Sequence, residues 1–140
     1  MSEENKALIR RFFKEVWNEK NLDAIDELVA ADQVDHDRPP GLPPGREGAK
    51  AFIGAYLNAF PDVKITIEDM IAKGDKVVTR WNATGTHTGE LMGIPATGIQ
   101  ISITGIDITR YSGGKSVEHW GQFDQLGMMQ QLGVVPVPGQ

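Results

Sequence analysis

The first third of the chain carries hydrophobic residues at helical spacing. One stripe consists of Leu8, Ile9, Phe12, Phe13, Val16 and Trp17. Recurrence at four-residue intervals predicts an amphipathic helix there. Asn21 begins a second, short helix that we expect to end near Asp32. A third helix is expected over 49–60, where Pro61 ends it.

After Pro61 the hydrophobic period changes from helical to alternating. Every second residue is hydrophobic from Val63 to Ile67, which predicts a strand. We expect strands at 63–73, 76–87, 99–111 and 115–123, and a short terminal helix at 125–132. The segment Arg38–Arg46 contains four prolines and two glycines in nine residues. Such a composition excludes helix and central strand and predicts an ordered loop.

Three helices followed by antiparallel strands indicate an α+β fold, with the helices packed on one face of a strongly curved antiparallel sheet. The length of 140 residues fits one domain over 1–140.

Composition narrows the possible partners. The formal net charge of −5 disfavours nucleic acid and anionic membranes as partners. No stretch approaches the roughly 18 apolar residues of a membrane span, so we expect a cytoplasmic protein. The absence of cysteine excludes disulfides and cysteine nucleophiles.

Several short motifs, spread over nearly the whole chain, together resemble one family. These are Asn5–Phe13, Val34–Asp37, Gly85–Gly89, Gly93–Gly98 and Gly114–Trp120. The chain is similar to the SnoaL-like polyketide cyclases, or ester cyclases, of the nuclear-transport-factor-2-like superfamily. This resemblance implies a cone-shaped barrel around an apolar pocket, in a homodimer.

The resemblance also implies a chemistry. Such enzymes close a ring of a hydrophobic, polyketide-like carbonyl compound by intramolecular aldol condensation, without metal or organic cofactor. In the family, a carboxylate on the last long strand transfers the proton. The matching position here is Gly121, which departs from the pattern.

The alternation of strand side chains gives a candidate replacement for that carboxylate. His119, Gly121 and Phe123 share one face of their strand, which the resemblance places inside the cone. A three-residue loop at 112–114 would set Asp107 opposite His119. Asp107 would then orient the imidazole, leaving its other nitrogen free as the base. The alternative is a buried hydrogen bond with a purely structural role.

Other polar and aromatic residues are weaker candidates. His87 ends a strand beside the loop 88–98, where it either hydrogen-bonds a substrate carbonyl or pins the loop. Trp81 is either a cavity wall or core. Met92 lies at an apolar loop tip that could cover a ligand or join a dimer interface.

The segment Asp35-His36-Asp37 suggests the rim of the pocket. Three adjacent strand residues cannot all face one ion, so no metal site is expected there. Asp35 and His36 are therefore candidate substrate contacts, and the alternative is an exposed strand end.

Three functions follow from these residues. The first is a cyclase or isomerase that uses acid/base chemistry at His119, Asp107 and His87. The second is a carrier that binds an apolar molecule without catalysis. The third, an epoxide hydrolase or isomerase on the same fold, needs an Asp–Arg–Asp or paired-acid floor, but alternation places Arg80 and Arg110 on the faces opposite Trp81 and Asp107.

Overall fold

The N-terminal hydrophobic stripe forms one long helical segment. A computed structural model describes residues 2–139. In it α1 (Ser2–Phe12) continues directly into a π-helical stretch, η1 (Phe13–Asn18). Two further helices follow, α2 (Ala24–Leu28) and α3 (Gly45–Ala59), and α4 (Gln125–Gln131) comes after the last strand. The three predicted N-terminal helices and the terminal helix are confirmed.

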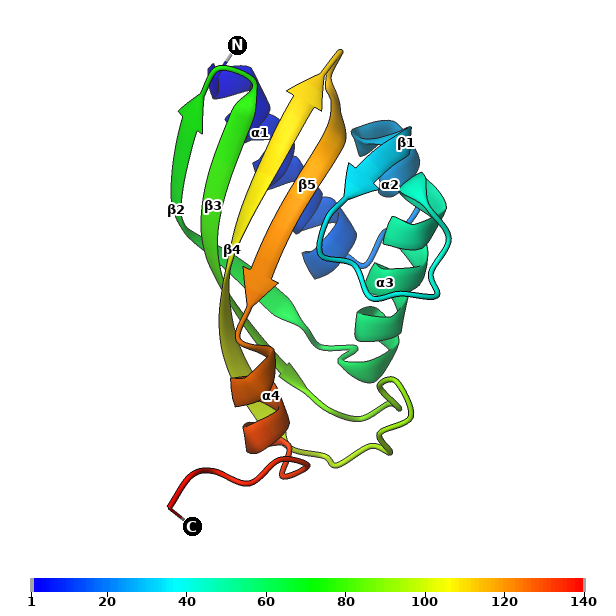
Figure 1. The fold of residues 1–140 in the computed structure, drawn as a ribbon, viewed down its shortest axis with the longest axis vertical. Helices are drawn as coiled ribbons and strands as arrows, with labels where there is room; N and C mark the ends of the chain where they lie inside the picture. The colour runs from blue at the N-terminus through cyan, green and yellow to red at the C-terminus, as the bar shows by residue number, and fades with distance from the viewer. Residues whose placement is uncertain (1, 140) are drawn as a thin grey trace.

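Five strands form one mixed sheet (Figure 1). They are β1 (Val29–Asp35), β2 (Lys64–Lys73), β3 (Lys76–Thr86), β4 (Gln100–Ser112) and β5 (Lys115–Phe123). Their order is β1-β5-β4-β3-β2, so β1 and β2 are the edges and the sheet does not close. The α+β class is confirmed, and the sheet curls around one side of the helices as in the cone fold.

The strand β1 corrects the prediction at residues 29–32. We expected the second helix to end near Asp32, but it ends at Leu28 and the chain becomes extended. The strand then pairs in parallel with β5, so the sheet is mixed and not antiparallel throughout. The segment VAADQVD lacks clean alternation, and only the long-range pairing with β5 makes it a strand.

The register between β4 and β5 also differs from the prediction. Ser112 pairs with Lys115, so the turn has two residues, Gly113 and Gly114, both with positive φ. The pairing then shifts once more between Tyr111 and Arg110. Asp107 therefore lies opposite Gly121, two residues from the predicted partner His119.

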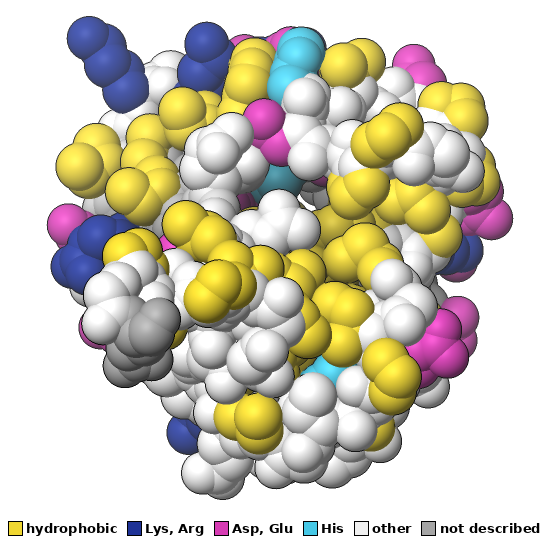
Figure 2. Space-filling view, turned by 60° about the horizontal axis from the view of Figure 1, so that its bottom comes forward, with side chains coloured by type: hydrophobic (Ala, Val, Ile, Leu, Met, Phe, Trp, Pro, Cys, Tyr) yellow, Lys and Arg dark blue, Asp and Glu magenta, His cyan; other side chains and the backbone are white. Residues whose placement is uncertain are grey.

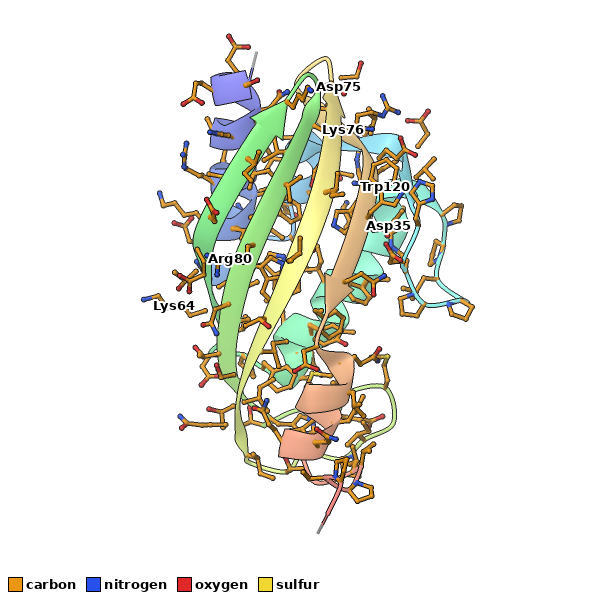
Figure 3. All side chains as sticks on the ribbon, turned by 60° about the vertical axis from the view of Figure 1, so that its left-hand side comes forward. Asp35, Lys64, Asp75, Lys76, Arg80 and Trp120 are labelled. Atoms are coloured by element: carbon orange, nitrogen blue, oxygen red, sulfur yellow. The ribbon has the colours of Figure 1, made fainter. Side chains whose placement is uncertain are left out.

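The helices cover the concave face of the sheet. Hydrophobic side chains of α1, η1 and α3 meet those of β2, β3 and β4 there. The opposite face carries side chains such as Lys76, Arg80 and Trp120, which Figure 3 labels. Packing between the layers is incomplete, and the space that remains forms the cavity described next.

Candidate functional site

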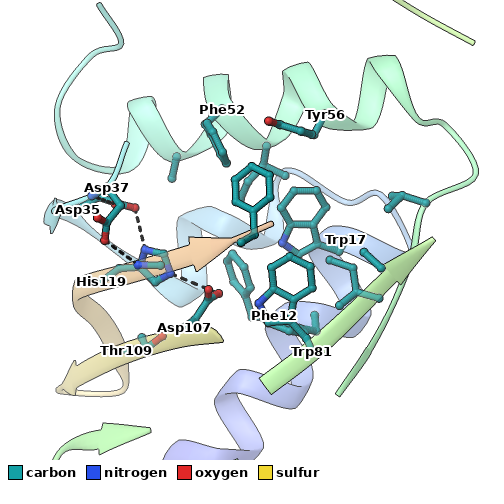
Figure 4. A pocket seen from close by; sticks show the side chains of 18 of the residues that line it. Phe12, Trp17, Asp35, Asp37, Phe52, Tyr56, Trp81, Asp107, Thr109 and His119 are labelled. Atoms are coloured by element: carbon teal, nitrogen blue, oxygen red, sulfur yellow. Dashed lines mark hydrogen bonds and ion pairs between the residues drawn. The ribbon is translucent and has the colours of Figure 1, made fainter. Parts of the chain in front are cut away.

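An apolar cavity of about 180 Å³ lies between the helices and the concave face of the sheet. Its wall is mainly hydrophobic and includes the aromatic side chains of Phe12, Trp17, Phe52, Tyr56, Trp81 and Phe123 (Figure 4). For scale, an engineered cavity of about 150 Å³ holds a benzene molecule. Hydrophobic side chains gather around a hollow on the surface, and a histidine and acidic side chains show near it (Figure 2). The cavity suits a ligand with a flat apolar body.

Three ionisable side chains meet at one end of this cavity. His119 Nδ1 lies 2.9 Å from Asp35 Oδ2, and His119 Nε2 lies 3.4 Å from Asp107 Oδ2 (Figure 4). The three residues come from β5, β1 and β4 and all line the cavity. The predicted contact between His119 and Asp107 is therefore present, although the strand register differs.

Asp35 has the role expected of Asp107. Its carboxylate holds Nδ1 of His119, the nitrogen nearer the backbone, and so orients the ring. Because Asp107 faces the second nitrogen, His119 has no free ring nitrogen, contrary to the expectation above. Among residues 2–139, Asp107 forms no hydrogen bond with Asp35, Asp37 or Arg38.

The two carboxylates change the charge state of the imidazole. Burial by itself lowers the pKa of His119, but the interactions with Asp107 and Asp35 outweigh it and raise the pKa to about 10. Burial alone would raise the pKa of Asp35, whereas the hydrogen bond and charge of His119 bring it below its usual value. At neutral pH His119 is therefore an imidazolium, and it lies between Asp35 and Asp107.

Gly121 makes room for this arrangement. A Cβ atom at this position would lie 2.9 Å from His119 Cε1 and 3.0 Å from Asp107 Oδ1. Real Cβ atoms do not approach that closely without displacing a neighbour. Asp107 and His119 thus occupy the space into which a side chain at position 121 would project.

A chain of hydrogen bonds connects Asp35 to polar residues that the sequence analysis did not identify. Arg38 Nη2 donates to Asp35 Oδ2 at 3.1 Å and to Gln33 Oε1 at 3.3 Å. Gln33 Nε2 in turn donates to the Ser116 hydroxyl at 2.6 Å. Arg38, Gln33 and Ser116 all line the cavity. The bond between Gln33 and Ser116 joins residues 83 positions apart, and the two Arg38 contacts are local but lie at the start of a loop without a regular period. Periodicity therefore could not reveal these contacts.

Asp37 also lines the cavity and ties the end of β1 to β5. Its carboxylate accepts hydrogen bonds from the backbone N–H of Gly121 at 2.8 Å and from Gln122 Nε2 at 3.0 Å. The neighbour His36 points the other way. It stacks on Trp120 with ring centroids 4.7 Å apart and lies 2.7 Å from Glu118 Oε2. His36 therefore lies outside the cavity, unlike Asp35.

His87 holds the loop that follows β3. Its side chain is fully buried, and Nδ1 accepts a hydrogen bond from the backbone N–H of Thr97 at 3.2 Å. The backbone of His87 bonds both Ile99 and Gly98 across the same loop. Since His87 is not among the residues that line the cavity, the loop-pinning alternative describes its position and the substrate contact does not.

The remaining candidates divide between the cavity and the surface. Trp81, Gly121 and Phe123 line the cavity as expected. Met92 does not: it is 53% exposed in a tight turn whose neighbour Leu91 is buried. Arg110 donates to Glu118 outside the cavity, which agrees with the alternation argument. Over residues 2–139, no helix is long and apolar enough to cross a membrane.

Solved structures with the same fold cover nearly the whole chain. TsrD from Streptomyces laurentii is 29% identical, with a TM-score of 0.86 over 95% of this chain and 97% of that chain. IdmH from Streptomyces antibioticus, a candidate polyketide cyclase, is 36% identical, with a TM-score of 0.79 over 93% and 99%. AclR from Streptomyces galilaeus, a candidate hydroxylase, is 29% identical, with a TM-score of 0.85 over 99% and 87%.

The family of this chain is identified from its sequence. No curated protein matches the chain. Residues 7–132 match the family described as SnoaL-like polyketide cyclase, which agrees with the cone fold and the apolar cavity. The chain therefore belongs to the SnoaL-like polyketide cyclase family.

Proposed function

We propose that the protein catalyses an intramolecular aldol ring closure of a hydrophobic polycarbonyl compound, with Asp107 and His119 transferring the proton. The observation that carries this proposal is the Asp107–His119 ion pair at one end of an apolar cavity. Family membership supports a cyclase-type function, and the cavity supports an apolar substrate. The alternative is a carrier that binds the same compound without turnover.

The proposed reaction begins with removal of a proton. The Asp107 carboxylate takes a proton from a carbon between two carbonyl groups, and the electron pair of the broken C–H bond becomes an enolate. The His119 imidazolium beside Asp107 stabilises the negative charge that develops on the substrate. The apolar wall of the cavity lowers the local dielectric constant, which strengthens this electrostatic stabilisation.

Ring closure then returns the proton. The enolate carbon attacks a second carbonyl carbon of the same molecule, a C–C bond forms, and the C=O π electrons move to oxygen. The resulting alkoxide takes the proton from the Asp107–His119 pair, which regenerates the starting charge state. The proton has moved from carbon to oxygen, so the step needs no further reactant.

The test is turnover of a 1,3-dicarbonyl compound with a tethered aldehyde. Asp107→Asn removes the base, so we expect kcat to fall by about 10²–10⁴-fold, the usual contribution of a general base. Glu118→Gln is the matched control, because Glu118 contacts His36 and Arg110 outside the cavity and should retain activity within about twofold.

Two results would contradict the proposal. If the wild-type protein binds the compound but does not convert it, the protein is a carrier. If the wild-type protein converts the compound and the kcat of Asp107→Asn is only a few-fold lower, the enzyme uses a different base.

A further inference from the structure

The segment Arg38–Arg46, which we call the proline loop, holds a largely buried arginine, Arg38, beside the candidate site. The side chain of Arg38 is 10% exposed, and the end of its guanidinium makes three hydrogen bonds. Nη1 donates to the backbone carbonyl of Gly45 at 2.9 Å, while Nη2 donates to Gln33 and to Asp35. Arginine remains charged when buried, so this cation is a permanent part of the site.

Arg38 and His119 share one oxygen of Asp35. Asp35 Oδ2 accepts from Arg38 Nη2 at 3.1 Å and from His119 Nδ1 at 2.9 Å. The other oxygen accepts the backbone N–H of Asp37 at 3.1 Å. Every one of these contacts favours the ionised carboxylate. Asp107, in contrast, forms an ion pair only with His119 among residues 2–139. The two carboxylates beside His119 are therefore not equivalent.

Two glycines at the start of α3 allow the proline loop and Arg38 to pack closely against the helix. Gly45 has a φ of +68°, and a Cβ on it would overlap the backbone of β1 at Ala31. A Cβ on Gly48 would lie 2.6 Å from Arg38 Nη1 and would overlap the carbonyl of Pro43. The loop therefore packs against the start of α3 so closely that the guanidinium has little freedom. The proline loop therefore positions Arg38 as well as connecting β1 with α3.

We propose that Arg38 is a positioning residue that keeps Asp35 ionised and aimed at His119, so that Asp107 is the carboxylate that exchanges protons with the substrate. The assignment of the exchange to Asp107 rests on the proposed function. The effect of Arg38 on Asp35 does not, because it belongs to the protein without substrate.

The charged groups around Asp35 are few. His119 faces it from β5, Arg38 from the proline loop, and Asp37 follows it on the chain; Asp107 of β4 lies beyond the imidazole. Gln33 and Ser116 are uncharged and complete the surroundings on the other side of the guanidinium. Removing the Arg38 charge is thus expected to act first on Asp35.

Carboxyl carbon NMR of ¹³C-labelled protein measures this effect directly, with the Asp35 signal assigned from Asp35→Asn. In Arg38→Gln the titration midpoint of Asp35 should rise by about one pH unit, the low end of the effect of a neighbouring arginine on an aspartate. Arg38→Met should give the same rise while keeping the apolar stem. Arg38→Lys retains the charge and should restore at least half of the change.

Arg110→Gln is the matched control. Arg110 Nε also donates to a carboxylate at 2.9 Å, but that carboxylate is Glu118, outside the cavity. The control should leave the Asp35 midpoint unchanged. If the Arg38 variants move Asp35 no more than the control does, and only lower the melting temperature, Arg38 merely fixes the loop and the proposal is wrong.

Kinetics then separate this proposal from the proposed function. If wild type catalyses the aldol closure, Arg38→Gln should lower kcat at least tenfold with KM within about twofold, because the cation acts through Asp35 and not on the substrate. A rise in KM with unchanged kcat would place Arg38 on the substrate and overturn the positioning role. If wild type shows no turnover, the proposed function fails, while the NMR result still decides the effect on Asp35.

Discussion

At the scale of single residues, the absence of a side chain at Gly121 allows the carboxylate of Asp107 to reach His119. The family pattern leads one to expect a carboxylate at position 121, and this chain has glycine there. Asp107, on the strand next to it, pairs with Gly121 and directs its carboxylate past the bare Cα toward His119. In the proposed function, Asp107 supplies from β4 the carboxylate that the family resemblance implies for the last strand. This exchange requires that position 121 stay without a side chain.

Gly121→Ala should separate the ion pair. The added methyl group overlaps His119 Cε1 and Asp107 Oδ1, so one of them must move. A displacement near 1 Å in a reacting group can cost about 10²-fold in rate, and we expect a loss of that order in kcat. Gly54→Ala is the control, because its Cβ would meet only Leu22 Cδ1, at 3.5 Å. Equal activities of the two variants would show that Gly121 has no such role.

At the scale of elements, the site joins strands that are distant in the chain. His119 of β5 contacts Asp35 of the edge strand β1 on one side and Asp107 of β4 on the other. The same strands also meet through backbone pairing of Asp35 with His119. The charged network therefore stabilises the docking of β1 as well as orienting the candidate catalytic groups.

This network predicts a dependence of stability on pH. A raised pKa in the folded state means that His119 stabilises the fold fully below the unfolded value of 6.5, and that this contribution is gone above about 10. The difference in unfolding free energy between wild type and His119→Gln should therefore shrink as pH rises from 6.5 to 10. Urea unfolding at several pH values measures it.

Ionisation of the buried tyrosines does not change the difference in unfolding free energy between wild type and His119→Gln. Burial raises the pKa of Tyr56 to about 12, so its ionisation also destabilises the fold at alkaline pH, but equally in both proteins. A difference that stays constant across the range would mean that the imidazole is neutral in the fold.

At the scale of the whole molecule, the uncovered face of the sheet carries a hydrophobic row. Successive register partners place Ile71, Val78, Ile108 and Trp120 side by side across β2, β3, β4 and β5. Ile71 is 63% exposed, and Ile106 beside the row is 51% exposed. Contiguous apolar surface of this kind is typical of a protein interface. We expect two copies of the chain to pair through it.

Ile106→Arg tests the pairing. Ile106 lies opposite Arg80 in the register of β3 and β4, so a second cation there would be buried in the dimer beside a like charge, and we expect the variant to be monomeric where wild type is dimeric. Light scattering after size exclusion measures the mass. Leu126→Glu on α4, where Leu126 is 60% exposed away from the sheet, should leave the mass unchanged. A monomeric wild type would contradict the expectation.

Local spacing in the sequence determined most of the elements. The stripe of α1, the period of α3 and the alternation of β2 to β5 are properties of neighbouring residues, so each could be predicted without a partner. The same alternation predicted that His119, Gly121 and Phe123 share one face of their strand, and they line the cavity together. Motifs along the chain were sufficient to indicate the family.

Only the tertiary structure decided which side chains meet. The strand β1 exists through pairing with β5, and that pairing brings Asp35 to His119 across 84 positions of sequence. A two-residue turn and a register shift moved Asp107 opposite Gly121, yet the absent side chain let it reach the imidazole. Arg38 joined the site because its loop packs on α3. Such contacts depend on long-range packing and register, which the hydrophobic pattern does not encode.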